Sequence, residues 1–85
     1  MPRVLVYTTD YCPYCTAAKR LLSSKGVPFE EIDVGGDDAA RQALVVRSGG
    51  QRTVPQIFVG ETHVGGYTDL AALDRTGGLD KLLGR

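Results

Sequence analysis

Short apolar runs and helical patterns alternate along the chain, and glycine or proline residues separate them. Residues 4–7 form a near-continuous apolar run, which is typical of a strand buried on both faces. Residues 13–25 carry apolar side chains at helical spacing, and Gly26 favours a helix end there. Residues 28–34 alternate imperfectly between apolar and polar, so they predict a second strand that ends at glycines 35–36.

The second half of the chain continues this pattern with shorter elements. A second helix is expected to begin after a capping Asp37 or Asp38 and to run to about Arg47. Residues 56–59 and 62–64 predict two short strands with a tight turn between them, which is typical of a β-hairpin.

The last part of the chain predicts helices only. Thr68 or Asp69 is expected to cap a third helix that runs to about Arg75, and residues 79–83 predict a final short helix. The resulting order of strands and helices indicates a layered α/β domain. Its first two strands should be parallel, because a helix joins them, and its last two should be antiparallel. In such sheets the carboxyl end of a strand is the usual place for a site, and Cys12 follows the first strand.

Composition and charge favour one globular domain over residues 1–85. Hydrophobic residues make up 42% and charged residues 24%, and ten basic residues balance ten acidic ones. This balance argues against a nucleic-acid or membrane surface driven by bulk charge. The N-terminus has no apolar signal region, and no run approaches the ~18 apolar residues of a membrane span. We therefore expect a cytoplasmic protein.

The pair Cys12 and Cys15, separated by Pro13 and Tyr14, carries the clearest chemistry. Pro13 suits the first position of a helix, so Cys12 would lie at the N-terminal end of that helix. Unpaired N–H groups and the positive end of the helix dipole stabilise a thiolate there, and the thiolate is the nucleophilic form of cysteine. Cys15 follows one helical turn later, close enough to form a disulfide with Cys12.

Three interpretations of the cysteine pair compete: thiol–disulfide exchange, a structural pair and half of a zinc site. In exchange, Cys12 attacks a disulfide sulfur and Cys15 resolves the mixed disulfide. A tetrahedral zinc site needs four ligands, whereas the chain has two cysteines and one histidine. The strand–helix context and a reducing compartment favour exchange, so we expect no metal site.

Thr53-Val54-Pro55, just before the third predicted strand, is the second candidate feature. Proline is acceptable at the first residue of a strand. A cis Val54–Pro55 bond would turn the backbone N–H and C=O of Val54 outward, where they could bind an extended thiol peptide. Trans is the more common state of such bonds and would make this segment a plain turn. The sequence leaves both states open.

Glycines 65–66 before a predicted helix start are the third candidate feature. They could bind a carboxylate, and Asp69 could pair with an ammonium group. The simpler interpretation is a strand-to-helix turn with an ordinary cap.

Three charged or titratable residues have simpler explanations. His63 is interpreted as a surface or packing residue, because nothing in the sequence pairs it with Cys12. Lys19 and Arg20 either raise the electrostatic potential near Cys12 or form a solvated helix face.

Together these motifs resemble the dithiol glutaredoxins, most closely the bacterial glutaredoxin 3 type. The matching segments span essentially the whole chain: Cys12-Pro13-Tyr14-Cys15, Leu22-Ser23-Ser24-Lys25-Gly26, Thr53-Val54-Pro55-Gln56-Ile57-Phe58, Gly65-Gly66-Tyr67-Thr68-Asp69-Leu70 and Gly77-Gly78-Leu79. The resemblance implies a thioredoxin-like fold, with a four-stranded mixed sheet flanked by three to four helices. It also implies a glutathione-dependent thiol–disulfide oxidoreductase that holds no tight cofactor and uses glutathione as its reductant.

The resemblance further implies a position for glutathione. Cys12 would hold its sulfur, and the corner from Gly66 to Asp69 would receive its γ-glutamyl end. Arg41 or Gln42 would meet its glycine carboxylate. By this resemblance the glutathione-binding residues are Tyr14, Thr53, Val54, Pro55, Gly66 and Asp69.

Three positions depart from the family pattern. Thr9 stands where the family commonly has a lysine, so a cation that would stabilise a thiolate or a carboxylate is missing. Tyr11 replaces a small threonine and would narrow or reshape the approach to Cys12. Thr68 replaces a frequent aspartate, which leaves Asp69 alone at its corner. These departures bear on affinity more than on the type of reaction.

The leading hypothesis is reduction of protein–glutathione mixed disulfides by Cys12 alone and of protein disulfides by both cysteines. Enzymes such as ribonucleotide reductase are then candidate partners. The alternatives are a redoxin reduced by thioredoxin reductase and a carrier in which two chains share a [2Fe–2S] cluster through Cys12 and two glutathiones. Pro13 argues against the cluster, and a non-catalytic binding module is the remaining class. We expect a monomer with no nucleic-acid or membrane partner.

Overall fold

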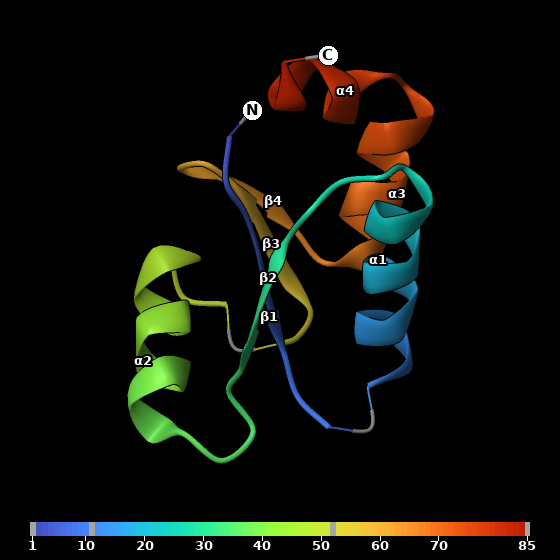
Figure 1. The fold of residues 1–85 in the computed structure, drawn as a ribbon. Helices are drawn as coiled ribbons and strands as arrows, with labels where there is room; N and C mark the ends of the chain where they lie inside the picture. Colours follow the sequence, from blue (N-terminus) through green and yellow to red (C-terminus); the bar gives the residue numbers. More distant parts are fainter. Residues whose placement is uncertain (1, 11, 52, 85) are drawn as a thin grey trace.

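The computed structural model describes residues 2–10, 12–51 and 53–84 (Figure 1). The predicted strands and helices are present in the predicted order. The elements are β1 (Val4–Thr8), α1 (Pro13–Ser24), β2 (Glu30–Asp33), α2 (Asp38–Arg47), β3 (Gln56–Val59), β4 (Thr62–Gly65), α3 (Tyr67–Arg75) and α4 (Gly78–Leu83). No helix in the described part of the chain is long and apolar enough to cross a membrane.

The four strands form one mixed sheet in the order β2-β1-β3-β4. β1 pairs in parallel with β2 and antiparallel with β3, and β3 pairs antiparallel with β4. These directions confirm the prediction. Because β1 and β3 run in opposite directions side by side, the carboxyl end of β1 and the amino end of β3 meet at one edge of the sheet. Cys12 and Pro55 are therefore neighbours despite their distance in sequence.

The helices cover both faces of the sheet. Figure 1 shows α1 and α3 against one face and α2 against the other, while α4 lies near the chain ends. All five residues of β1 are buried, as the apolar run predicts. Their side chains alternate between two cores. The α1–α3 side contains Val4, Val6, Ala18, Leu22, Val27, Ile57, Val59, Leu70, Leu79 and Leu83, and the α2 side contains Leu5, Tyr7, Val34, Leu44 and Phe58.

Two element boundaries differ from the sequence prediction at the strands. β2 begins at Glu30, later than predicted, because it pairs only with Leu5–Thr8 of β1 and Pro28 has no N–H to donate. β4 continues to Gly65, which pairs with Ile57 although the glycine pair was expected to end the strand.

The start of α3 was predicted wrongly. The helix begins at Tyr67 with Gly66 as its N-cap, so neither Thr68 nor Asp69 is the cap. Asp69 lies in the first turn instead, and its Oδ2 accepts a hydrogen bond from the Gly66 N–H at 3.1 Å. The carboxylate thus satisfies the N-terminal donor from inside the helix, a role that sequence spacing alone does not distinguish from a cap.

Candidate active site

Cys12 occupies the N-cap of α1, and both its sulfur and its backbone carbonyl accept hydrogen bonds from the first turn of the helix. Its Sγ accepts a hydrogen bond from the Cys15 N–H at 3.1 Å, and its carbonyl accepts from the Thr16 N–H at 3.1 Å. Pro13 takes the first helical position, as predicted. The sulfur therefore lies where the helix presents unpaired donors and its positive end, an arrangement that stabilises negative charge on Cys12.

The two cysteines form a disulfide whose Cα atoms are 5.1 Å apart, yet their environments differ. Cys12 is half-buried at the end of the helix, whereas the Cys15 residue is 2% exposed. An incoming disulfide can therefore reach Cys12 more readily than Cys15. The two cysteines therefore differ in how readily another molecule can react with them.

The bond between Val54 and Pro55 is cis. Of the two states that the sequence leaves open, the cis bond is therefore present and the plain trans turn is not. The Val54 carbonyl oxygen lies 3.8 Å from Cys12 Sγ, so the segment before β3 borders the reactive sulfur.

A small open cavity next to this segment brings the predicted glutathione-binding residues together. Its volume is about 170 Å³. We call it the cis-proline cavity, and its lining residues are Tyr14, Thr53, Val54, Pro55, Gly66, Tyr67, Thr68 and Asp69. All six residues expected to contact glutathione are among them. Arg41 and Gln42, expected at the glycine carboxylate, do not line it.

Tyr67 is the lining residue that sequence reasoning did not single out. Its ring centroid lies 6.4 Å from that of Tyr14, with the planes tilted by 31°. Tyr14 is 64% exposed and lines the same cavity. An aromatic residue directly after the glycine pair was the available signal, since the glycines place it at the start of a helix beside the site.

The Gly65–Asp69 corner is closely packed around the Asp69 carboxylate. Gly65 has a φ of +115°, and a Cβ built on it would meet Asp69 Oδ2. A side chain at this position would therefore displace the carboxylate. Because Asp69 already accepts from the Gly66 N–H, this corner presents negative charge from the chain itself. It suits an ammonium group better than the carboxylate considered from sequence.

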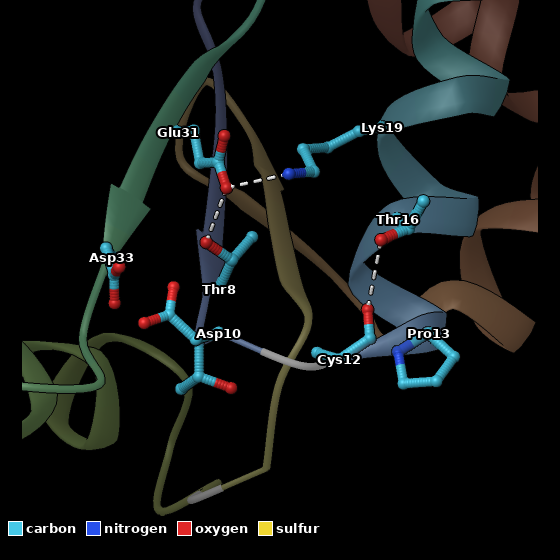
Figure 2. A pocket seen from close by; sticks show the side chains of 9 residues that line it. Thr8, Asp10, Cys12, Pro13, Thr16, Lys19, Glu31 and Asp33 are labelled. Atoms are coloured by element: carbon cyan, nitrogen blue, oxygen red, sulfur yellow. Dashed lines mark hydrogen bonds and ion pairs between the residues drawn. The ribbon is translucent and has the colours of Figure 1, made fainter.

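A larger groove is lined in part by Cys12 and contains several charged side chains (Figure 2). We call it the charged groove; its volume is about 460 Å³ and its lining residues are Thr8, Thr9, Asp10, Cys12, Pro13, Thr16, Lys19, Glu31 and Asp33. Its described lining includes three carboxylates and the ammonium of Lys19. The groove is thus more acidic than basic.

Lys19 and Glu31 connect α1 to β2 across this groove. Lys19 Nζ lies 2.9 Å from Glu31 Oε2, and the hydroxyl of buried Thr8 donates to the same oxygen at 2.8 Å. The hydrogen bond from Lys19, and then that from Thr8, lowers the pKa of Glu31. Lys19 is therefore an ion-paired residue rather than a freely solvated one, whereas Arg20 is exposed. Thr9 lines the groove, and Tyr11 lies outside the described residues.

Comparison with known proteins identifies the family. Residues 4–64 match the family model described as Glutaredoxin. A glutaredoxin from Pseudomonas aeruginosa is 57% identical over 83 residues, with 98% of each chain covered. Glutaredoxin 3 of Escherichia coli K12 is 54% identical over 83 residues, covering 98% of this chain and 99% of that one.

Solved structures agree in fold. A Brucella melitensis glutaredoxin superposes with a TM-score of 0.84 at 49% identity, over 98% of this chain and 89% of the other. A buckwheat glutaredoxin–glutathione complex gives a TM-score of 0.86 at 32% identity, over 98% and 77%. The chain belongs to the glutaredoxin family, with a thioredoxin-like fold and a redox-active cysteine pair, and is a glutathione-dependent disulfide oxidoreductase.

Proposed function

We propose that this glutaredoxin reduces protein–glutathione mixed disulfides through Cys12 and protein disulfides through Cys12 and Cys15 together. The observation that carries the proposal is the asymmetry between the two sulfurs. Cys12 is accessible at a helix N-terminus and receives the Cys15 N–H at 3.1 Å, whereas Cys15 is 2% exposed. Thus Cys12 is the nucleophile and Cys15 the resolving residue.

Reduction of a glutathionylated protein needs Cys12 alone. The Cys12 thiolate attacks the glutathione sulfur, a Cys12–glutathione disulfide forms, and the protein sulfur leaves as a thiolate that takes a proton. A second glutathione thiolate then attacks the glutathione sulfur of that mixed disulfide. The products are glutathione disulfide and the regenerated Cys12 thiolate, so one disulfide is exchanged for another and two electrons come from glutathione.

Reduction of a protein disulfide uses both cysteines. Cys12 attacks one substrate sulfur and forms a mixed disulfide, and the other substrate sulfur leaves. The Cys15 thiolate then attacks Cys12 Sγ, which releases the second substrate thiol and forms the Cys12–Cys15 disulfide. Two glutathione molecules reduce that disulfide in turn.

The cis-proline cavity is the proposed binding site for the glutathione portion of the substrate. Its wall offers the Val54 backbone, the Thr53 hydroxyl and the Asp69 carboxylate within one small cavity. The relative from buckwheat was solved with glutathione bound, which supports the same ligand here. In this proposal Tyr14 flanks the glutathione sulfur. Asp69, which lies beside Gly66, binds the ammonium group of glutathione.

The same proposal describes a monomer of one domain, residues 1–85, acting in the cytoplasm. An oxidised dithiol returns to its reduced form only where glutathione is itself kept reduced, which supports this placement. Protein disulfides such as that of ribonucleotide reductase are the proposed macromolecular substrates.

The experiment that tests the proposal measures turnover of a glutathionylated peptide and of a disulfide-bonded protein, with glutathione, glutathione reductase and NADPH. C15S should retain most peptide turnover and lose most reduction of the protein disulfide. C12S should fall to the uncatalysed rate with both substrates. Peptide turnover by C12S at the wild-type rate would overturn the assignment of Cys12. A parallel assay with thioredoxin reductase in place of glutathione tests the redoxin alternative, which predicts turnover in that assay alone.

A further inference from the structure

A chain of hydrogen bonds runs along the α2 side of the sheet from strand β4 to the segment before Pro55. His63 Nε2 lies 2.6 Å from Gln56 Oε1, and Gln56 Nε2 donates to Thr53 Oγ1 at 3.2 Å. The chain begins at an exposed strand residue, passes through a buried one and ends at an exposed hydroxyl. Nothing in the reaction described above uses His63 or Gln56.

Gln56 is a polar residue in an otherwise apolar strand, and it is 4% exposed. Burying an amide is costly unless its polar atoms are hydrogen-bonded. Both ends of this amide have partners, and no buried side-chain nitrogen or oxygen in the described part of the chain lacks one. An apolar residue of similar size would avoid the cost altogether, so stability alone does not account for a glutamine at this position.

The chain of hydrogen bonds has a direction, because the amide oxygen accepts a hydrogen bond and the amide nitrogen donates one. Gln56 Oε1 can only accept, so His63 Nε2 must carry the hydrogen. Gln56 Nε2 can only donate, so Thr53 Oγ1 accepts. Within the described residues, the hydroxyl hydrogen of Thr53 then has no protein acceptor. Thr53 is left as a hydrogen-bond donor toward whatever occupies the space beside it.

Packing fixes the position of His63, where the chain of hydrogen bonds begins. The His63 ring stacks on Phe58, its partner in the β3–β4 register, with ring centroids 4.8 Å apart and planes at 27°. The Arg47 guanidinium lies over the Phe58 ring at 4.9 Å. The imidazole therefore cannot easily turn away from Gln56, and the amide keeps its orientation.

Thr53 stands at the boundary between two open cavities. It lines the cis-proline cavity and also a neighbouring cavity of about 330 Å³ whose wall includes Gln56 and His63. Gly66 and Asp69 line both cavities as well. Thr53 therefore lines the region in which the proposed function places glutathione.

We propose that Gln56 is a positioning residue: anchored by His63, it orients the Thr53 hydroxyl as a donor to an acceptor oxygen of the glutathione portion of the substrate. This inference rests on the proposed function. Hydrogen bonds in series polarise one another, so anchoring the first strengthens the last. Gln56 thereby affects binding of the glutathione portion rather than the chemistry of Cys12.

The test is a double-mutant cycle between Gln56 and Thr53, read as KM and kcat for a glutathionylated peptide. Loss of one such hydrogen bond predicts that T53V and Q56M each raise KM roughly threefold to tenfold with little change in kcat. The double variant should show no further increase, because Gln56 acts through the hydroxyl that T53V removes. T53S should keep the wild-type KM.

Q56E is a sharper variant. Its carboxylate fits the same space, and in its ionised form it can accept hydrogen bonds but cannot donate them. It would take the Thr53 hydroxyl hydrogen for itself, so KM should rise as much as in T53V. H63F keeps a ring on Phe58 but removes the donor to Gln56, and a smaller rise in KM is expected. If Q56M does not fold, Q56E and H63F still decide the question.

Two further readouts separate this mechanism from general damage. Thermal unfolding midpoints identify variants that are merely destabilised. The rate at which the reduced Q56M and H63F variants react with dipyridyl disulfide, which has no glutathione portion, should equal that of the wild-type enzyme. Additive increases in KM across the cycle, an unchanged KM in Q56M, or equal losses with dipyridyl disulfide would overturn the inference. Absence of peptide turnover in the wild-type enzyme would instead defeat the proposed function itself.

Discussion

The charged groove is lined in part by Cys12, and the cis-proline cavity includes Val54, whose carbonyl oxygen lies 3.8 Å from Cys12 Sγ, but the two differ in how they present polar atoms. The residues that line the cavity carry hydroxyl groups and one carboxylate, that of Asp69, which accepts a hydrogen bond from the Gly66 N–H. The groove offers mainly side-chain charges on separate elements, with Lys19 paired to Glu31. Directional groups select a ligand by shape, whereas exposed charges act by sign and are screened by salt. The cis-proline cavity therefore suits selection of a ligand by shape, and the charged groove suits an effect of charge near Cys12.

The largest expected effect comes from removing charge in the cis-proline cavity. D69N keeps the size of the side chain and an oxygen for the Gly66 N–H, but it loses the partner for a ligand ammonium group. The catalytic efficiency for a glutathionylated peptide should fall roughly tenfold or more, mainly through KM, since hydrogen bonds to charged groups are the strong ones. Steady-state kinetics at fixed glutathione measure this loss.

D33N is the matched control, because it removes the same charge from the charged groove. Glutathione carries net negative charge, so this substitution should leave the efficiency unchanged or raise it slightly. Equal losses of catalytic efficiency in D69N and D33N would show that the cis-proline cavity and the charged groove do not differ in their effect on this substrate.

A smaller effect is expected from adding a cation to the charged groove. T9K places an ammonium group at the position where the family resemblance implies a lysine, among the carboxylates of Asp10, Glu31 and Asp33. At surface distances such a charge is worth on the order of 1 kcal/mol, so efficiency with a glutathionylated peptide should rise about threefold to fivefold. The rise should shrink as salt is added.

T9M is the control for T9K, because it supplies comparable length without charge. A gain in T9M equal to that in T9K, or a gain that persists in high salt, would contradict an electrostatic role for the groove.

The smallest effect concerns stability rather than activity. The pKa of Glu31 is lowered by Lys19 and Thr8, so ionised Glu31 stabilises the fold above its unfolded pKa of about 4.3. That stabilisation is lost as the pH falls through the lower folded value. Because the pair is partly exposed, E31Q should cost under about 1 kcal/mol of unfolding free energy at neutral pH.

Urea unfolding of wild type and E31Q at neutral and at acid pH measures this difference. The gap in unfolding free energy should close once Glu31 is protonated in both states. A gap that stays constant with pH would show that the substitution acts through something other than the charge of Glu31. Peptide turnover at neutral pH should barely change.

The sequence predicted the fold well because its signals are local. The apolar run of β1, Pro13 at the start of α1 and the glycines at element ends act within a few residues of where they stand. The start of α3 was missed because Asp69 satisfies the Gly66 N–H from the third helical position. An N-cap residue and an acidic residue in the first turn of a helix stand only two or three positions apart. The sequence pattern alone therefore does not distinguish one from the other.

The sequence predicted residues that line one cavity, but it did not predict the contacts between them. The resemblance supplied the six residues that meet in the cis-proline cavity. The His63–Gln56–Thr53 chain was not visible, because it depends on the hairpin register that sets His63 opposite Phe58. Likewise Lys19 meets Glu31 only because α1 packs over the parallel pair β1–β2. Both contacts follow from register and packing, which periodicity does not encode.

The closeness of Cys15 to Cys12 has a kinetic consequence. In the proposed mechanism, a mixed disulfide on Cys12 can be opened by free glutathione, at a rate proportional to glutathione concentration, or by Cys15, whose Cα lies 5.1 Å from that of Cys12. The second route is intramolecular and has a fixed effective molarity. Plentiful glutathione therefore drives the single-thiol route, and scarce glutathione leaves the enzyme trapped in its internal disulfide. Because Cys12 at the N-cap and Cys15 in the first helical turn lie close together, the ratio of the two routes reports the concentration of glutathione around the enzyme.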